Sequence, residues 1–119
     1  MTKNKVIPLT VSDAGHYRWG QGCDGWHLLR TDRLSVIKER MPPGSYEGLH
    51  RHRESQQVFY VLSGEATFVI EGEPAVVKQG EGIHVAPGTN HMVRNAGSVD
   101  LEFLLISEPQ AHGDRVDVG

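Results

Sequence analysis

The sequence has one cysteine, Cys23, so it cannot form an intramolecular disulfide. A chain of 119 residues is long enough for one domain with a core that needs neither disulfides nor a structural metal. So little cysteine fits a reducing compartment, and we expect a cytoplasmic protein. The N-terminal stretch MTKNKVIPLT lacks the apolar centre of a signal peptide, and no apolar run reaches membrane-spanning length. We therefore expect no membrane partner.

The sequence also lacks an excess of charge of one sign. Its net charge is −3, with acidic and basic residues mixed along the chain. Proteins that bind nucleic acid present concentrated basic surfaces, so nucleic acid is not an expected partner. Apolar residues at helical spacing are nearly absent, which argues against a helical fold.

Glycine is abundant, with 14 residues, and short apolar runs alternate with glycine-containing turns. This spacing predicts an antiparallel sandwich or barrel. The stretch EGEP at 71–74 predicts a hairpin turn, because Gly72 can adopt a positive φ. The segments 1–25 and 107–119 look irregular and are expected to be arms that cover an edge strand or a partner subunit. The expected strands are 26–29, 34–41, 58–62, 66–70, 75–77, 83–85, 91–94 and 101–106.

The run at 58–62 is apolar at every position. Side chains alternate between the two faces of a strand, so Phe59 and Val61 are expected on the same face as Gln57, towards an internal cavity. Val58, Tyr60 and Leu62 then point the other way and also need cover. This pattern predicts a homodimer.

Seven histidines are unusual in so short a chain, and His50 and His52 are separated by one residue. In an extended strand these two side chains point to the same side, where their nitrogens can bind one metal ion. The flanking spacing is G-x5-H-x-H-x4-Q-x6-G, from Gly44 to Gly64, with Gln57 as the polar residue.

A second spaced set lies at 80–95, in the stretch GEGIHVAPGTNHMVRN. Gly80, Gly88, His91 and Asn95 follow the pattern G-x5-P-x-G-x2-H-x3-N. Ala86 occupies the proline position of that pattern, and a proline follows one residue later.

The two sets together resemble the two sequence motifs of the cupin family, in which the first motif carries a glutamate where this chain has Gln57. The resemblance implies an all-β fold, a jelly-roll β-barrel of two antiparallel sheets with a metal inside. It also implies a single cupin domain over 1–119, with motif 1 at about 44–64 and motif 2 at about 80–95.

Carried over by position, the resemblance implies that His50, His52, Gln57 and His91 bind a divalent transition metal such as Fe, Mn, Ni or Zn. Three alternatives stay open for Gln57. It binds the metal through its side-chain oxygen, it hydrogen-bonds a water held by the three histidines, or the site is degenerate and empty. Gln56 is the neighbouring alternative, although its distance to Gly64 fits the motif less well.

Three neutral imidazoles and an amide leave the full +2 charge of a divalent ion, which favours an anionic or enolisable ligand. An amide cannot accept a proton at ordinary pH, so any general base must come from elsewhere. His84 is a candidate base, with an outward, solvated position as the alternative. Glu39, Tyr60 and Glu102 are further candidates whose orientation depends on strand phase.

Cupins of this size include dioxygenases, isomerases and lyases that act on small oxygenated acids or sugars. The resemblance therefore predicts a metal-dependent enzyme with a small-molecule ligand. Two alternatives remain, a non-catalytic module that binds a small molecule or sugar, and a structural barrel with an empty site.

Overall fold

The computed structural model describes residues 6–118, which form strands and no helix. In this part of the chain, therefore, no helix is long and apolar enough to span a membrane. The strands are β1 (Gly15–Trp19), β2 (Cys23–Arg30), β3 (Ser35–Met41), β4 (His50–His52), β5 (Gln56–Ser63), β6 (Glu65–Ile70), β7 (Glu73–Lys78), β8 (Gly82–Val85), β9 (His91–Arg94), β10 (Leu101–Glu108) and β11 (Arg115–Asp117).

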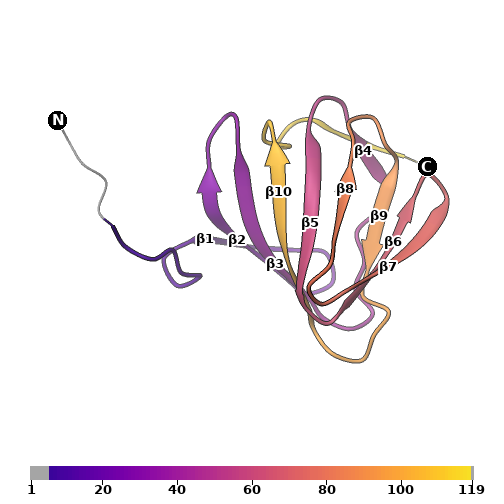
Figure 1. The fold of residues 1–119 in the computed structure, drawn as a ribbon, viewed down its shortest axis with the longest axis horizontal. Helices are drawn as coiled ribbons and strands as arrows, with labels where there is room; N and C mark the ends of the chain where they lie inside the picture. The colour runs from indigo at the N-terminus through magenta and orange to yellow at the C-terminus, as the bar shows by residue number, and fades with distance from the viewer. Residues whose placement is uncertain (1–5, 119) are drawn as a thin grey trace.

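The strands form two antiparallel sheets (Figure 1). One sheet has the order β1-β2-β3-β10-β5-β8, and the other has the order β11-β4-β9-β6-β7. The expected all-β architecture of two antiparallel sheets is confirmed. Strands distant in sequence are neighbours in both sheets, as β3 and β10 are, so the topology brings separated segments to a common interior.

β5 shows why this sequence makes a barrel wall. Its residues alternate between exposed and buried, with Gln57, Phe59 and Val61 inside at 4%, 2% and 0% exposure. Val58, Tyr60 and Leu62 lie on the outer face, as the alternation predicts. Phe59 packs against two other core aromatics with ring centroids 5.0 and 5.6 Å away, so the core fills one part of the barrel interior.

The turn expected at 71–74 joins β6 to β7. Glu71 and Gly72 both have positive φ, 49° and 82°. Two successive positive φ values define a type I′ turn, whose twist matches that of an antiparallel hairpin. The prediction of a hairpin here is confirmed.

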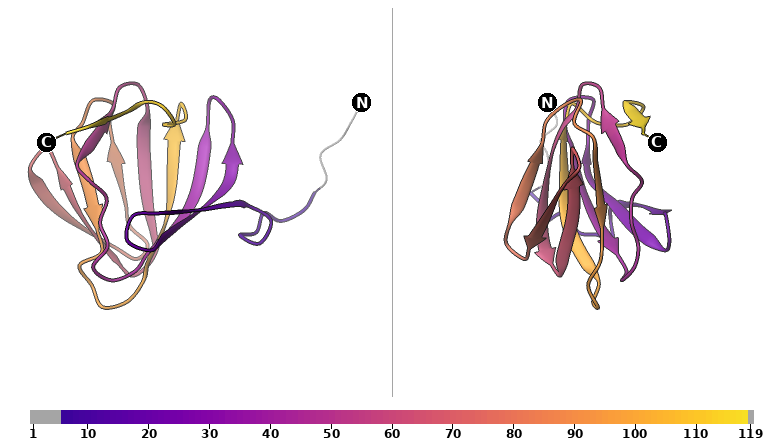
Figure 2. Two further views of the ribbon diagram at one scale, coloured as in Figure 1. Left: turned by 180° about the vertical axis from the view of Figure 1, so that it is seen from behind. Right: turned by 90° about the vertical axis from the view of Figure 1, so that its right-hand side faces the viewer.

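The two terminal segments expected as arms take part in the sheets. Residues 15–19 and 23–25 belong to β1 and β2, which pair with each other at the edge of the larger sheet. Near the C-terminus, β11 pairs with β4, and the side view in Figure 2 shows the two strands next to each other. Residues 1–5 and 119, also within the expected arms, lie outside the described residues.

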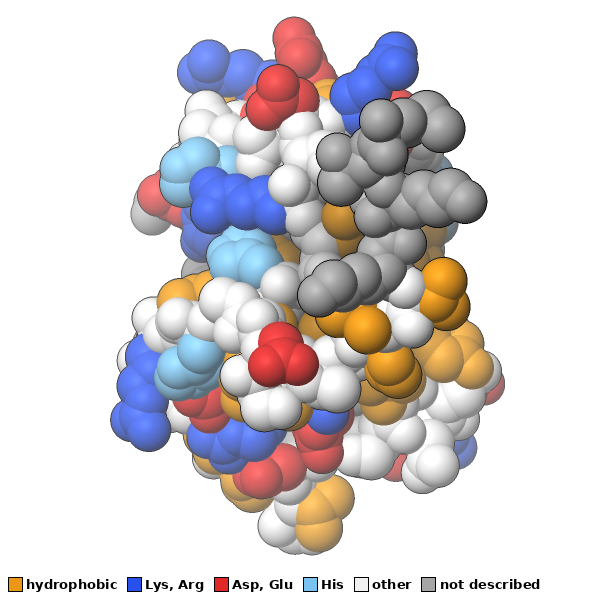
Figure 3. All heavy atoms as spheres, turned by 90° about the vertical axis from the view of Figure 1, so that its left-hand side faces the viewer, with side chains coloured by type: hydrophobic (Ala, Val, Ile, Leu, Met, Phe, Trp, Pro, Cys, Tyr) orange, Lys and Arg blue, Asp and Glu red, His pale blue; other side chains and the backbone are white. Residues whose placement is uncertain are grey.

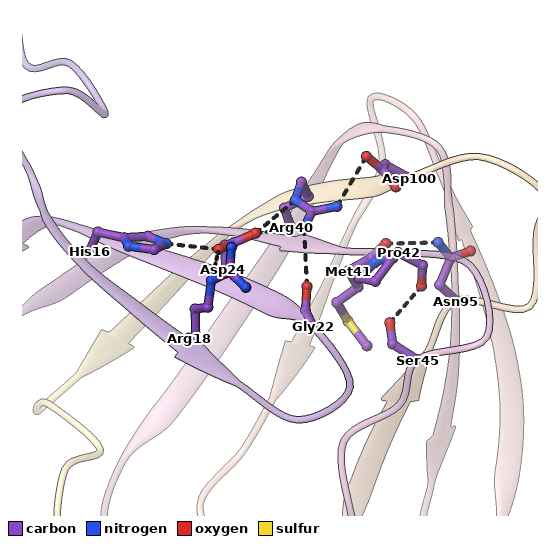
Figure 4. A network of polar contacts seen from close by, with 10 residues as sticks. All are labelled: His16, Arg18, Gly22, Asp24, Arg40, Met41, Pro42, Ser45, Asn95 and Asp100. Carbon is purple, nitrogen blue, oxygen red and sulfur yellow. Dashed lines mark hydrogen bonds and ion pairs between the residues drawn. The ribbon is translucent and has the colours of Figure 1, made fainter.

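β1 and β2 form one end of the molecule, where histidine side chains lie beside lysine and arginine at the surface (Figure 3). Asp24 of β2 links this end to the rest of the sheet (Figure 4). Its carboxylate accepts hydrogen bonds from His16 Nε2 at 2.8 Å and from Arg40 Nη2 at 2.6 Å. Arg40 also bonds Asp100 at 3.2 Å, so one arginine joins β2, β3 and the loop before β10.

Candidate metal centre

Three histidines converge from two neighbouring strands of the smaller sheet. His50 and His52 lie on β4, and His91 on β9 is the direct cross-strand partner of His50. All three side chains are buried, at 2%, 7% and 0% exposure. One nitrogen from each lies within 4.8 Å of those of the other two. The expectation that His50 and His52 point to one side is confirmed, and the three imidazoles can hold a metal ion.

Backbone contacts orient two of these rings. His50 Nδ1 donates to Gly48 O at 2.8 Å, and His91 Nδ1 donates to Thr89 O at 2.9 Å. A proton on Nδ1 leaves Nε2 of each neutral ring with its lone pair free, the arrangement that metal-binding histidines have. His91 Nε2 is buried and has no hydrogen-bond partner in the protein.

Burial lowers the pKa of all three histidines, because a charged imidazolium is poorly solvated inside the barrel. The pKa of His52 falls to about 4, through burial first and then through the neighbouring His50 and His91. The three rings are therefore neutral at pH 7. Neutral rings are the form that binds a metal, since a proton on the ligand nitrogen would compete with the ion.

Gln57 of β5 reaches the same region from the opposite sheet, and its side chain is buried. Its Nε2 donates to Ser107 Oγ at 3.0 Å, while its Oε1 is buried without a partner in the protein. A buried oxygen left without a partner costs about 1–3 kcal/mol. A divalent cation would satisfy both Gln57 Oε1 and His91 Nε2, so the residues present fit a metal.

A cavity of about 420 Å³ opens beside this cluster, and it contains two carboxyl groups. Glu39 of β3 accepts a hydrogen bond from Tyr17 Oη at 2.9 Å. Burial, followed by the charge of Glu47, raises the pKa of Glu39 to about 8, although the Tyr17 hydrogen bond lowers it. The residues that line the cavity include Tyr17, Arg30, Glu39, Glu47, His50 and Gln57.

Of the two cavity carboxyl groups, that of Glu47, between β3 and β4, lies closer to the histidines. Its Oε1 is 3.7 Å from His50 Nε2, and its Oε2 is 3.3 Å from Arg115 Nη1. Burial raises the pKa of Glu47, while Arg115 opposes that shift. The two cavity carboxyls therefore differ in their partners, because Glu47 has a cation beside it and Glu39 has a tyrosine hydroxyl.

The residues considered as general bases differ in whether they face the cavity or the solvent. His84 is exposed on β8, its Nε2 lies 2.9 Å from Gln56 Oε1, and it does not line the cavity. This corresponds to the outward, solvated alternative. Tyr60 is 42% exposed on the outer face. Glu102 lies away from the cavity, where it forms an ion pair with Lys38 at 2.9 Å. Of these candidates, only Glu39 points inward.

Sequence analysis missed Tyr17, Glu47 and Arg115. Glu47 lies three residues before His50, close enough in sequence to have been considered with it. Tyr17 and Arg115 fall in segments that looked irregular, and no spacing in the sequence connects them to the two motifs.

The fold and the site together define a small β-barrel with three buried histidines beside a cavity. A family model described as a cupin domain matches residues 37–107. The chain therefore belongs to the cupin family, and the resemblance carried by the two motifs is confirmed. The matched residues run from β3 to β10 and include both motifs. The match therefore covers the three histidines and Gln57.

Two curated relatives cover most of the chain. An oxalate-binding protein of Thermotoga maritima is 37% identical over 109 residues, 87% of this chain and 88% of that protein. An uncharacterized protein of Methanocaldococcus jannaschii is 35% identical over 89 residues, 74% of this chain and 71% of that protein.

Solved structures agree with the fold. A Thermotoga maritima protein described as a predicted oxalate decarboxylase has a TM-score of 0.79 at 28% identity, over 87% of this chain and all of that one. The polyketide cyclase RemF of Streptomyces resistomycificus has a TM-score of 0.81 at 18% identity, over 97% of this chain and 87% of that one. The second likeness shows the fold alone.

Proposed function

We propose that this protein holds one divalent transition metal, such as Fe, Mn, Ni or Zn, through His50, His52, His91 and Gln57. The observations that carry the proposal are three buried, neutral imidazoles whose nitrogens lie within 4.8 Å of one another, and the buried, unpartnered amide oxygen of Gln57, which lines the same cavity. Gln57 Oε1 is free for this role because Ser107 takes the amide nitrogen. Among the alternatives for Gln57, this orientation supports direct binding to the metal.

The ligand that this site suits is a small anion with oxygen donors. The four proposed metal ligands are neutral, so a bound divalent ion keeps its +2 charge and acts as a Lewis acid for oxygen ligands. Arg30 lines the cavity as a further positive group. The 37% identical relative named an oxalate-binding protein supports a carboxylate as the ligand class.

The proposed activity is that of a dioxygenase, an isomerase or a lyase acting on an anionic or enolisable substrate. Gln57 cannot move a proton, and His84 lies outside the cavity, so proton transfer falls to the cavity carboxyls. A non-catalytic binding protein is the second candidate, favoured by the name of that same relative. Dioxygen consumption or product formation with a carboxylate substrate separates the two.

Metal analysis of protein purified without an affinity tag tests the site. We expect close to one transition metal per chain, and His52→Ala should lose most of it because one of three imidazole ligands is gone. His84→Ala is the matched control and should keep the metal, since His84 is exposed and outside the cavity. Equal metal in wild type and His52→Ala would refute the site, and a metal-free wild type that takes up no added ion would support the structural barrel.

A cytoplasmic location remains a prediction from the cysteine content alone. Cys23 is free and fully buried, which is compatible with a reducing compartment.

A further inference from the structure

Glu39 is held in the cavity by an arrangement that uses three adjacent strands. Tyr17 on β1 and Glu39 on β3 both pair with Gly25 of β2, which lies between them. A Cβ atom at position 25 would collide with the Tyr17 ring, so glycine at this position lets the ring lie across β2. The Tyr17 hydroxyl thereby reaches Glu39 Oε1 at 2.9 Å.

Within the described part of the chain, Glu39 has no cation near enough to form an ion pair. Among residues 6–118, no lysine, arginine or histidine nitrogen lies within 4 Å of its carboxyl group, and its exposure is 7%. Its neighbour on β10 is Phe103, which is apolar and buried. A buried carboxylate without a counter-ion is strongly disfavoured, and the group takes up a proton instead.

The charged and titratable groups around Glu39 act on its protonation in both directions, and burial together with Glu47 outweighs the Tyr17 hydrogen bond. Glu47 adds a second negative charge from the segment before β4 and raises the pKa of Glu39 further. Tyr17 faces it from β1, and β2 contributes His27 and Arg30 to the same cavity. The pKa of about 8 leaves Glu39 protonated at neutral pH. Because Oε1 accepts from Tyr17, the proton is available on Oε2.

We propose that Glu39 is a ligand-binding residue that, as a neutral acid positioned by Tyr17, donates a hydrogen bond to an oxygen of the bound anion. This inference rests on the proposed metal-dependent anion site. It assigns the cavity two functional ends, one at the histidines and Gln57 and one at Glu39. A ligand that uses both ends carries two oxygen functions, as short dicarboxylates and hydroxy or keto acids do.

The cavity volume supports a ligand with two separated oxygen groups. About 420 Å³ lies within the range of small-molecule sites and exceeds what oxalate alone would fill. The polar groups in such sites are few and fix orientation, while apolar walls supply contact area. Phe59, Ile37 and Leu105 provide that wall between the two ends.

The test is titration of oxalate and of malonate into the metal-loaded protein, by calorimetry, across the pKa of Glu39. We expect wild-type affinity to fall as pH rises through the pKa of Glu39, because deprotonation removes the donor and adds a negative charge beside the anion. Relative to Glu39→Gln, the wild-type affinity for the dicarboxylate should fall by up to about tenfold per pH unit, which is the slope for one linked proton. Glu39→Gln keeps a neutral donor at every pH, and it retains Glu47, His27 and Arg30, whose titration therefore cancels in the comparison.

Tyr17→Phe distinguishes positioning from packing. The Tyr17 hydrogen bond stabilises the ionised form of Glu39, so its removal should move the break in the wild-type profile to higher pH. An unmoved break, or identical pH profiles for wild type and Glu39→Gln, would overturn the role of Glu39 while leaving the anion site intact. If neither dicarboxylate binds the metal-loaded protein at any pH, the proposed function fails and this inference fails with it.

Discussion

Gln57 sets the charge of the proposed metal centre. Its amide contributes an oxygen without the negative charge that a glutamate would bring. Ser107 on β10, its direct cross-strand neighbour, accepts from Nε2 and so leaves Oε1 without a hydrogen-bond partner in the protein. A single side chain therefore determines both an available ligand atom and the net charge that an incoming anion meets.

Replacing Gln57 by glutamate tests this charge. Gln57→Glu should bind the metal at least as tightly as wild type, because a carboxylate attracts a cation more than an amide does. It should weaken oxalate binding by a free energy on the order of 1–3 kcal/mol, since the charge at the open positions falls by one unit. Chelator competition gives the metal affinity, and calorimetry gives the oxalate affinity.

Gln56→Glu is the matched control for Gln57→Glu. It makes the same charge change one residue away, on an exposed side chain that bonds Glu108 rather than the cavity groups. Equal oxalate affinity in both variants would show that Gln57 does not contact the metal, as would unchanged metal affinity in Gln57→Ala.

The turns at two glycines differ in how closely other parts of the chain pack against them. Gly64, between β5 and β6, and Gly72, between β6 and β7, have nearly equal φ values of 80° and 82°. Their surroundings differ. A Cβ at position 64 would lie 2.6 Å from Asp100 O, whereas a Cβ at position 72 would meet nothing within 4 Å. The first turn is packed against the chain that enters β10, and the second is open.

Alanine at these two glycines separates backbone strain from crowding. Gly72→Ala should lower the free energy of unfolding by roughly 1–2 kcal/mol, the cost of a left-handed conformation for an L-residue. Gly64→Ala should lose about 1–3 kcal/mol more, because the backbone at Asp100 must shift. Denaturant unfolding monitored by tryptophan fluorescence measures both. Equal losses would mean that the contact with Asp100 relaxes freely.

β11 shows how a terminal strand contributes to the site. It pairs with β4, where Arg115 lies opposite His52, and Arg115 also contacts Glu47. Just before this strand, Asp114 accepts hydrogen bonds from the backbone N–H groups of Arg53 and Ser55 at 3.0 and 2.9 Å. The C-terminal segment thus fastens the chain that leaves the metal-binding strand.

The outer face of the larger sheet leaves apolar side chains in solvent in the single chain. Val58, Tyr60 and Leu62 of β5 are 37%, 42% and 37% exposed. Contiguous exposed apolar side chains on a soluble protein mark an interaction surface. If a second copy of the chain packs through the same face, as in a two-fold dimer, the apolar faces of both copies are covered.

We therefore predict a homodimer through this face. Light scattering at micromolar concentration should give the mass of two chains for wild type, and Leu62→Lys should give one because a charge would be buried in the interface. Val76→Lys is the control, since Val76 is 53% exposed on β7 of the other sheet, and it should stay dimeric. A monomeric wild type would contradict the prediction.

The sequence alone was sufficient for the fold class and for the histidine cluster. Strand alternation in β5, the turn at Glu71 and Gly72, and the common side of His50 and His52 all depend on residues near one another in the chain. Such local geometry follows from the two-residue repeat of a strand and from turn chemistry. The position of His91 came from the family motif, because no local rule relates it to His50.

Only the tertiary structure decided which polar groups share the cavity. It turned His84 outward and Glu39 inward, and it brought Tyr17, Glu47 and Arg115 to the site from three different segments. It also determined which atom of the Gln57 amide is unpartnered, because Ser107, fifty residues away in sequence, accepts from Nε2 and leaves Oε1 free. These outcomes depend on strand phase and on pairing between distant strands, where a shift of one residue moves every side chain to the opposite face.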